Sequence, residues 1–427
     1  MRVLQVVGRA EGGVRRHLVQ LTRRLEQHRF VVAAPAEVLE ALEASPTVED
    51  LWPLPAGDSL LDSWQAARLL GERLGEASHR RFDLVHIHGW RAALALPVLI
   101  TRRLPVVWTV HTVPPPGTLA RAWIGRWLRP GRSGSIRVIA VSESLAREVA
   151  RLWPGCRPRL HAVRNGLAPE ELEALSEKRR ERHGTRFHRP PGPLQGSAPG
   201  WRQAAPGFEP AFPWPMPMPI LGYMGRLWGP KGVFDAVEVL ARLARAGWPA
   251  VLLVAGDGPH REAMTRLAGE RGVEERLHLL GWREPGDFLA QIDLLLHPSR
   301  SEGGVPYAVM EAMAAGVPVV GYGLPPLKEV AEAARQAHGQ ELLHLVPPGD
   351  AAGLARRCAA CLNNAEATAR QAEAAATFAR AAFRLEPVLE AVDRIYREAV
   401  QKAADLVQGR ERLRPEPGLA GPDRVRI

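Results

Sequence analysis

The chain has 427 residues, a hydrophobic fraction of 46% and a formal net charge of +10 at pH 7. This length exceeds the size at which one hydrophobic core usually stops growing, so we expect two domains. The positive charge favours anionic partners, but the sparse aromatic residues do not alternate with basic ones, which argues against nucleic-acid binding.

The cysteine content and the length of the apolar runs indicate the cellular compartment. Three cysteines, Cys156, Cys358 and Cys361, cannot form a disulfide framework. Cys358 and Cys361 lie in an alanine-rich helical run with no second pair to complete a metal site. The apolar run before Gly8 is too short for a signal sequence, and no later run reaches the length of a membrane span. We therefore expect a cytoplasmic protein without a bound metal.

In the first half of the chain, short apolar runs rich in β-branched residues alternate with helical patterns. Strands that are buried on both faces and separated by helices predict a parallel sheet in a doubly wound domain. The expected strands lie within residues 2–7, 29–35, 82–89, 104–112 and 136–142. We place this first domain at residues 1–176.

The same pattern restarts near residue 219. The expected strands lie within residues 219–225, 250–256, 276–281, 293–299 and 317–322, and we place this second domain at residues 219–380. Two doubly wound domains in tandem predict a cleft between the carboxyl ends of two sheets, which is where such folds bind ligands.

Three further segments differ from both halves. Residues 177–218 open with a charge run, and ten prolines lie between Pro190 and Pro219, which is typical of a disordered or polyproline linker. We predict a terminal helix over residues 381–407 and a disordered tail over residues 408–427.

The stretch SEGGVPYAVMEAMAAG, residues 301–316, places Glu302 and Glu311 around a Gly-Gly turn and a helix start. Pro306 suits the first helical position, and Gly316 indicates the helix end. The N-terminus of a helix presents unpaired N–H groups and a positive dipole end, which attract phosphate. An anionic ligand is one interpretation of this stretch; an ordinary solvated turn is the other.

A basic glycine loop, GRLWGPKG, follows the first strand of the second domain. Arg226 and Lys231 lie among its glycines, so one guanidinium and one ammonium can neutralise a diphosphate that approaches the backbone closely. The next strand ends in AGDGP, where Gly256 begins a turn into a helix.

These segments belong to a longer ordered set: GGV, TVHT, AVSES, VRNG, GRLWGPKG, AGDGP, LLGW and EGGVPYAVMEAMAAGVPVV. Together they resemble the retaining glycosyltransferases of family 4, the glycosyl transferases group 1, which have the GT-B fold. The resemblance covers nearly the whole chain except the proline-rich segment and the tail. It implies an α/β protein with two Rossmann-like domains that face a cleft, and a terminal helix that crosses back to the first domain.

The resemblance also implies a reaction. A sugar would pass from a nucleoside diphosphate sugar, bound mainly by the second domain, to a hydroxyl of a carbohydrate or lipid-linked acceptor, bound mainly by the first. Charge on the leaving group would be compensated without a metal ion or another cofactor. The synthesis of envelope glycans or glycolipids is one expected setting.

Carried onto this sequence, the resemblance assigns catalytic roles to four side chains, those of Arg226, Lys231, His111 and Glu302. It assigns donor binding to Glu311, which would bind the ribose hydroxyls, and to backbone groups at Gly303, Gly304, Val305, Gly225 and Gly256. It assigns the first loop, near the donor phosphates or the acceptor, to Gly12 and Gly13.

The spacing of the two acids departs from the family pattern. Seven residues separate them in the family, but eight lie between Glu302 and Glu311, so that Gly303 stands at the expected position. Either the Gly303–Gly304 turn carries an extra residue that lets Glu302 reach the sugar, or the first acid is absent. In the second case, backbone N–H groups up to Val305 would bind the donor instead.

Arginines and tryptophans alternate between Arg121 and Arg132, with Trp123 and Trp127 on one side of a predicted helix. The pattern fits an interfacial helix on an anionic membrane, which would place the protein at the inner face of the cell membrane. It fits equally a surface helix that packs its tryptophans on the first domain.

Two other functions remain open. A noncatalytic protein that binds sugar nucleotides or acts as a scaffold would explain the displaced acid. A nucleotide-sugar epimerase shares the two-domain architecture. The nucleotide base, the sugar, the acceptor and the oligomeric state do not follow from the fold.

Overall fold

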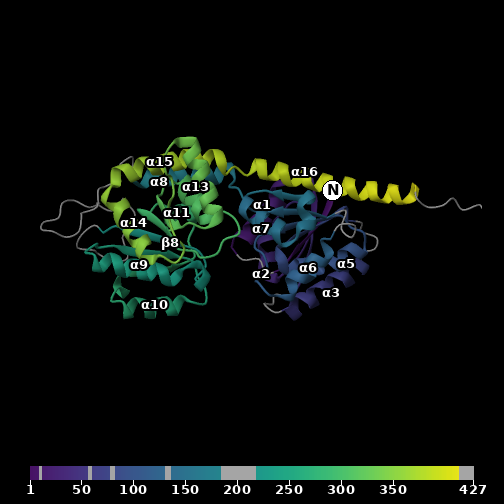
Figure 1. Cartoon of the computed structure of the whole chain (residues 1–427), viewed down its shortest axis with the longest axis horizontal. Coiled ribbons are helices and arrows are strands. Elements are labelled where there is room, and N and C mark those ends of the chain that lie inside the picture. Colours follow the sequence, from purple (N-terminus) through teal and green to yellow (C-terminus); the bar gives the residue numbers. More distant parts are fainter. Residues whose placement is uncertain (9–11, 56–59, 77–81, 130–135, 184–217, 413–427) are drawn as a thin grey trace, which may run out of the picture.

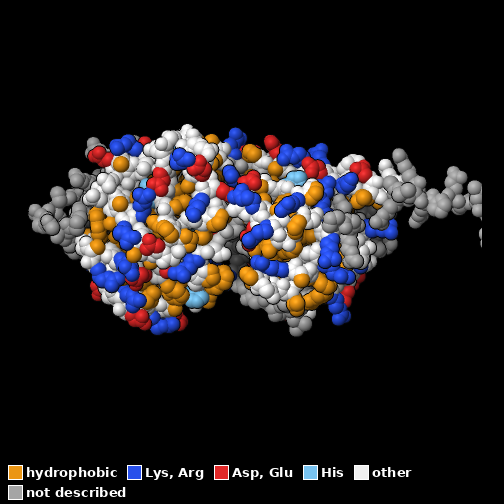
Figure 2. All heavy atoms as spheres, in the orientation of Figure 1, with side chains coloured by type: hydrophobic (Ala, Val, Ile, Leu, Met, Phe, Trp, Pro, Cys, Tyr) orange, Lys and Arg blue, Asp and Glu red, His pale blue; other side chains and the backbone are white. Residues whose placement is uncertain are grey.

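The computed structural model describes residues 1–8, 12–55, 60–76, 82–129, 136–183 and 218–412. They form two α/β lobes, each built on one parallel sheet, which confirms the expected fold class (Figure 1). A notch separates the lobes on the face seen in the space-filling view (Figure 2).

The first lobe has a seven-stranded sheet in the order β3-β2-β1-β4-β5-β6-β7. Its strands are β1 (Arg2–Val7), β2 (Arg29–Ala34), β3 (Val48–Pro53), β4 (Leu84–His88), β5 (Val106–Val110), β6 (Ile136–Ala140) and β7 (Leu160–Ala162). Its helices are α1 (Gly13–Arg24), α2 (Ala36–Leu39), α3 (Leu60–Glu76), α4 (Gly89–Ala92), α5 (Leu96–Thr101), α6 (Leu119–Trp127) and α7 (Glu143–Leu152).

The second lobe has a six-stranded sheet in the order β10-β9-β8-β11-β12-β13. Its strands are β8 (Ile220–Met224), β9 (Val251–Ala255), β10 (Leu277–Gly281), β11 (Leu294–His297), β12 (Val319–Tyr322) and β13 (His344–Val346). Its helices are α9 (Val233–Arg245), α10 (Arg261–Glu270), α11 (Pro285–Leu289), α12 (Tyr307–Ala314), α13 (Pro325–His338), α14 (Ala351–Asn363) and α15 (Ala365–Ala382).

Helices cover both faces of each sheet, which explains why the central strands are almost wholly apolar. In β1, Leu4 packs into one core of the first lobe, whereas its neighbour Val3 packs into the core on the opposite face. The period-two alternation of a strand therefore separates two apolar layers here, not an apolar and a polar one.

Two helices cross between the lobes. Helix α8 (Pro169–His183) follows the first sheet but packs on the second lobe, where the Ser176 hydroxyl donates to the Ala314 carbonyl at 2.9 Å. Helix α16 (Glu386–Arg412) returns along the first lobe (Figure 1). The two crossings are bonded to each other, because Leu167 N donates to Phe383 O at 2.7 Å and Leu385 N donates to Leu167 O at 2.9 Å.

The element ends differ from the expected boundaries in three places. Residues 177–183, expected in the linker, continue α8, and residues 408–412, expected in the tail, continue α16. Pro306 is the N-cap residue of α12 and not its first helical residue, because its ψ of 140° is extended. The rest of the expected linker and tail, residues 184–217 and 413–427, lies outside the described residues.

Candidate functional site

The glycine loops after β8 and β9 meet backbone to backbone at the carboxyl edge of the second sheet. Gly225 N donates to Ala255 O at 2.9 Å. A Cβ atom on Gly256 would lie 1.9 Å from Gly225 O, and its φ of +136° also disfavours a side chain. The two expected donor-binding glycines are therefore adjacent. Close approach requires the glycine at position 256, whereas a Cβ atom on Gly225 would meet only Tyr223, at an ordinary 3.6 Å.

Lys231 and Glu302 form the charged centre of this edge. Lys231 Nζ donates to Glu302 Oε1 at 2.7 Å, and the Glu302 side chain is only 10% exposed. His297, at the end of β11, brings its Nε2 atom to 3.6 Å from the same oxygen. Arg226 lies on the same loop as Lys231, and its carbonyl accepts a 3.0 Å hydrogen bond from the Tyr223 hydroxyl.

Two opposing effects set the ionisation of Glu302. Burial raises its pKa, but the neighbouring His297 and the positive charge of Lys231 outweigh burial and lower the pKa to about 2. Burial and the negative charge of Glu302 both raise the pKa of Tyr223. At neutral pH the centre therefore contains a carboxylate beside an ammonium, with a neutral phenol that holds the loop backbone.

The position of Glu302 bears on its irregular spacing from Glu311. The Gly303–Gly304 turn passes so close to the first lobe that a Cβ atom on Gly303 would lie 1.7 Å from His111 O. Despite the irregular spacing, the Glu302 carboxylate reaches Lys231. This geometry fits the first of the two alternatives, in which the acid is present at the site.

Glu311 lies on α12 and faces α1 of the first lobe. Its carboxylate accepts a hydrogen bond from Arg16, and Arg16 also donates to Glu171 at 3.1 Å. The Arg16 guanidinium lies 4.4 Å from the ring centre of Tyr307. Burial raises the pKa of Glu311, while the charge of Arg16 opposes that effect. Glu311 is therefore a buried acid whose partner comes from the other lobe.

His111 belongs to a cluster of buried histidines in the first lobe, with His17 and His88. The ring centres of His17 and His111 are 5.5 Å apart, and those of His88 and His111 are 5.9 Å apart. Burial lowers the pKa of His17 to about 4 and that of His111 to about 3. His111 Nε2 is buried and has no hydrogen-bond partner in the described structure. A neutral imidazole of this kind can hydrogen-bond a hydroxyl group but cannot supply a positive charge.

The first loop meets the start of α12. A Cβ atom on Gly13 would lie 3.3 Å from the Tyr307 ring, and the Tyr307 hydroxyl donates to Gln20 Oε1 at 2.9 Å. Gly12 precedes α1 with a φ of +54° and has open space around it. The structure thus brings Gly13 and the EGGVPY segment together across the cleft.

The remaining expected donor-binding residues also lie at this contact. Val305 is 3% exposed, and a Cβ atom on Gly304 would lie 2.9 Å from Val141. The Ser142 hydroxyl donates to Gly303 O at 2.7 Å. Ser142 is also the N-cap of α7, where its side chain accepts from Leu145 N.

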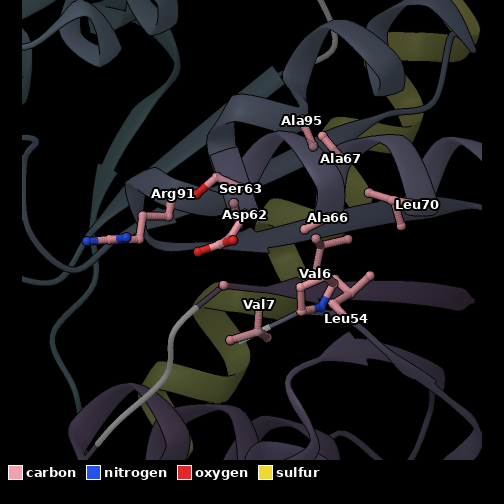
Figure 3. A pocket seen from close by; sticks show the side chains of 13 residues that line it. Val6, Val7, Leu54, Asp62, Ser63, Ala66, Ala67, Leu70, Arg91 and Ala95 are labelled. Carbon is pink, nitrogen blue, oxygen red and sulfur yellow. The ribbon is translucent and has the colours of Figure 1, made fainter. Parts of the chain in front are cut away.

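A separate pocket opens in the first lobe at the carboxyl end of β1 (Figure 3). Val6, Leu54 and Leu70 form its apolar floor. Asp62 and Arg91 line the side nearer the viewer's left, together with Ser63. The pocket therefore combines an apolar surface with charged groups, but its volume of about 30 Å³ is far below that of small-molecule sites, which is roughly 300 Å³ or more.

The sequence analysis did not identify four residues that lie at the cleft: Arg16, Tyr307, His297 and Tyr223. Two of them follow motif residues closely, since Arg16 is one turn beyond Gly13 and Tyr307 follows Pro306. His297 ends a predicted strand five residues before Glu302. No local signal indicates that Arg16 pairs with Glu311, because that contact joins residues almost three hundred positions apart.

Helix α6 packs mainly on its own lobe. Ile124 is fully buried, and Trp127 packs against the core of the first lobe. Trp123 contacts Trp64, which is 48% exposed. Arg132, the last residue of the expected basic segment, lies outside the described residues. Within the described ranges, no helix is long and apolar enough to cross a membrane, and no group of three or more His, Cys, Asp or Glu residues could hold a metal ion.

Two facing parallel sheets, two crossing helices and glycine loops at the cleft define a protein of the GT-B fold class. Residues 11–171 match the family described as Glycosyltransferase Family 4, and residues 218–364 match Glycosyl transferases group 1. The chain belongs to the group 1 glycosyltransferase family.

Curated relatives match parts of the chain. The 2-deoxystreptamine glucosyltransferase of Streptomyces kanamyceticus is 39% identical over 25% of this chain and 28% of its own length. The 2-deoxystreptamine N-acetyl-D-glucosaminyltransferase of Streptomyces fradiae is 32% identical over 44% of each. The chain thus spans less than half the length of these relatives. Glycogen synthase of Mycobacterium tuberculosis is 26% identical over 81% of this chain and 75% of its own length.

Solved structures show the same fold at low identity. Anabaena Alr3699/HepE, crystallised with UDP and glucose, has a TM-score of 0.70 at 19% identity, covering 92% of this chain and 98% of its own. WaaG, a glycosyltransferase involved in lipopolysaccharide biosynthesis, has a TM-score of 0.67 at 16% identity, covering 92% and 99%.

Proposed function

We propose that the protein is a retaining glycosyltransferase that moves a sugar from a nucleoside diphosphate sugar to an acceptor hydroxyl. The observation that carries this proposal is the Lys231–Glu302 pair, held at 2.7 Å beside the glycine loops and facing the first lobe. It places one cation and one ionised acid where a doubly wound domain binds its ligand.

The chemistry requires the donor's anomeric carbon to lose its bond to the diphosphate oxygen and to form a bond to the acceptor oxygen. The acceptor attacks on the face that the diphosphate leaves, which retains the anomeric configuration, and the acceptor proton passes to an oxygen of the departing diphosphate. Arg226 and Lys231 supply two positive charges for the departing diphosphate, which is the principal electrostatic demand of the reaction. We propose that no metal ion is needed, and activity in excess EDTA tests this.

Three other groups take roles in this scheme. Glu311 accepts hydrogen bonds from the ribose hydroxyls once Arg16 releases it. Neutral His111, whose Nε2 atom is unpartnered, hydrogen-bonds a hydroxyl of the transferred sugar. Glu302 approaches the same sugar from the other side of the Gly303 turn.

The acceptor is proposed to enter from the first lobe. The polar groups Asp62, Ser63 and Arg91 are the proposed contacts for one hydroxyl of the acceptor, because the pocket they line, at about 30 Å³, is too small for a whole sugar (Figure 3). The names of relatives that act in lipopolysaccharide core and colanic acid biosynthesis support an envelope glycan as one product class.

A ligand screen tests the proposal. UDP-, GDP- and ADP-sugars and the free diphosphates are added to the wild-type protein, and the unfolding temperature is measured. UDP compounds come first because the HepE structure contains UDP. One base should raise the unfolding temperature, and Arg226→Ala, Lys231→Met and Glu311→Gln should each reduce that shift.

The exposed lysine of α16 provides the matched control, so Lys402→Met should keep the full shift. Stabilisation without transfer to any acceptor, and without loss in Glu302→Gln, would favour a noncatalytic sugar-nucleotide-binding protein. No shift with any nucleotide, from well-folded protein, would contradict both proposals.

We also propose peripheral contact with an anionic membrane through the segment from Arg121 to Arg129. Leu119 is 80% exposed at the start of α6, beside the partly exposed pair Trp64 and Trp123. Apolar groups flanked by arginines bind the surface of anionic bilayers. Flotation with anionic liposomes at low salt should carry the protein upward, and Leu119→Ser with Trp64→Ser should abolish that; wild-type protein that stays in the bottom fraction contradicts the proposal.

A further inference from the structure

A second groove lies away from the Lys231–Glu302 centre, where the returning segment between α15 and α16 meets the edge of the first sheet. Helix α16 begins at the waist between the lobes (Figure 1). The groove lies between residues 161–165, which include the end of the edge strand β7, and residues 381–395. It encloses about 490 Å³, within the range of small-molecule sites.

Arginines from three segments line this groove: Arg164 after β7, Arg384 before α16, and Arg394 within α16. Arg164 and Arg394 form no ion pair with any residue that the structure describes. Arg384 has only a loose contact, 3.5 Å, with Glu386. Glu143 is the one acid in the lining, so the groove has a net positive charge.

Two polar side-chain atoms in the lining also lack hydrogen-bond partners in the described structure. Asn165 is 9% exposed, and its Oδ1 atom has no hydrogen-bond partner. His161 Nε2 likewise has no hydrogen-bond partner, and its nearest charged group is the Glu398 carboxylate at 3.8 Å. Buried polar atoms are normally satisfied, so these two atoms mark a place where a ligand hydroxyl can donate. Ala162, Val388 and Ala391 supply the apolar part of the wall.

We propose that this groove binds a small phosphorylated sugar or polyol as a second ligand, distinct from the sugar donor. The phosphate pairs with Arg164 and Arg394, and the hydroxyls reach Asn165 and His161. Unpaired guanidinium groups in a shared groove are the usual partners of phosphate. None of the lining residues belongs to the Arg226, Lys231 and Glu302 set.

Because of where the groove lies, a bound ligand would affect how the two lobes are joined. Arg164 stands just before the point where Leu167 bonds to both Phe383 and Leu385, which is the junction of the two crossings. A ligand held by Arg164 and Arg394 therefore ties the end of the first sheet to the returning helix. Binding stabilises this junction and with it the relative position of the lobes.

Glucose 6-phosphate is the probe, with glucose and inorganic phosphate as separate arms, and calorimetry on the full chain is the measurement. Glucose 6-phosphate should bind the wild type, and Arg164→Gln with Arg394→Gln should weaken binding by about tenfold or more. The double control Arg370→Gln with Lys402→Gln removes two exposed charges from α15 and α16 and should leave binding unchanged.

The Lys231→Met variant separates this groove from the donor site. Glucose 6-phosphate should bind Lys231→Met as it binds the wild type, and UDP should not compete. Equal binding by the arginine double variant and the wild type overturns the proposal, as does loss of binding in Lys231→Met. Binding of glucose and glucose 6-phosphate with equal affinity also overturns it, because the arginines would then have no part.

An independent readout comes from the His161 ring. Burial lowers the pKa of His161, with the nearby charges of Glu398 raising it and those of Arg137 and Arg394 lowering it. A phosphate that neutralises Arg394 should raise this pKa in histidine-ring NMR, where His161→Gln assigns the signal. An unchanged His161 titration in the presence of saturating glucose 6-phosphate contradicts the proposed location.

Discussion

The Lys231–Glu302 hydrogen bond affects both the ionisation of Glu302 and the stability of the folded protein. Glu302 has a pKa of about 2 because His297 and Lys231 favour its ionised form more than burial disfavours it. A carboxyl group whose pKa is depressed in the folded state stabilises the protein above its unfolded pKa. That contribution is lost as the pH falls from the unfolded value of 4.5 toward 2.

Replacing Glu302 with Gln should therefore change how stability depends on pH. The difference in unfolding free energy between the wild type and Glu302→Gln should shrink by about 2 kcal/mol between about pH 5 and pH 3. Urea unfolding at several pH values measures it. Glu373→Gln, at an exposed position on α15, should show no such change, and a constant difference for Glu302→Gln would mean that the acid is not paired in solution.

Arg16 and Glu311 form the corresponding pair between the lobes. Arg16→Met should destabilise the protein by about 2 kcal/mol, because it leaves a nearly buried carboxylate without its cation. The double variant Arg16→Met with Glu311→Gln should recover part of this loss, since it removes the unpaired charge as well. Urea unfolding of the four proteins gives the coupling energy; additive effects would show that the two side chains do not interact.

At the scale of the elements, the sequence predicted the central strands and missed three edge strands, β3, β7 and β13. Central parallel strands are buried on both faces and form apolar runs that are visible in the sequence. An edge strand needs fewer apolar residues, as in β3, where VEDLWP mixes acids with a single buried tryptophan. β7 and β13 have three residues each, too few to show a period.

The candidate site also contains residues that the sequence predicts and residues that it does not. The glycine loops and Lys231 could be predicted, because charge and glycine at a strand end are local features. The partners of Glu311 and His111 could not, since Arg16 reaches Glu311 from α1 of the other lobe, and His17 and His88 meet His111 only when separate elements pack together. The buried histidines are single letters in the sequence, and their clustering depends on the order of strands β1, β4 and β5.

Helix α16 is anchored to the first sheet by Tyr396. Its hydroxyl accepts from Gln5 Nε2 at 3.1 Å and lies 2.7 Å from His86 Nδ1, so it can donate there. Tyr396→Phe leaves both buried groups without a partner and should cost about 2 kcal/mol of unfolding free energy. Thermal or urea unfolding measures the loss, and Gln401→Ala, at an exposed position on the same helix, should be neutral. A neutral Tyr396→Phe would show that the anchor is packing alone.

At the scale of the whole molecule, the lobes meet through backbone as well as side chains. Gly303 lies against His111 O, Ser142 bonds to Gly303 O, and Arg147 pairs with Glu329 at 2.8 Å. Such a contact between lobes is smaller than either core, so it is the first part of the molecule to separate. Any ligand in the cleft acts on this contact.

Gly303→Ala tests whether the lobes meet in solution as they do here. The added Cβ atom would lie 1.7 Å from His111 O, which no backbone contact tolerates, so the lobes should be forced apart at a cost of about 1–2 kcal/mol. Small-angle scattering should then show a larger radius of gyration, while far-UV circular dichroism stays that of the wild type. Gly71→Ala, where a Cβ meets Val98 at an ordinary 3.4 Å, should leave the scattering unchanged. If Gly303→Ala scatters like the wild type, the lobes are already apart in solution, and the Ser142 and His111 contacts then form only when a ligand closes the cleft.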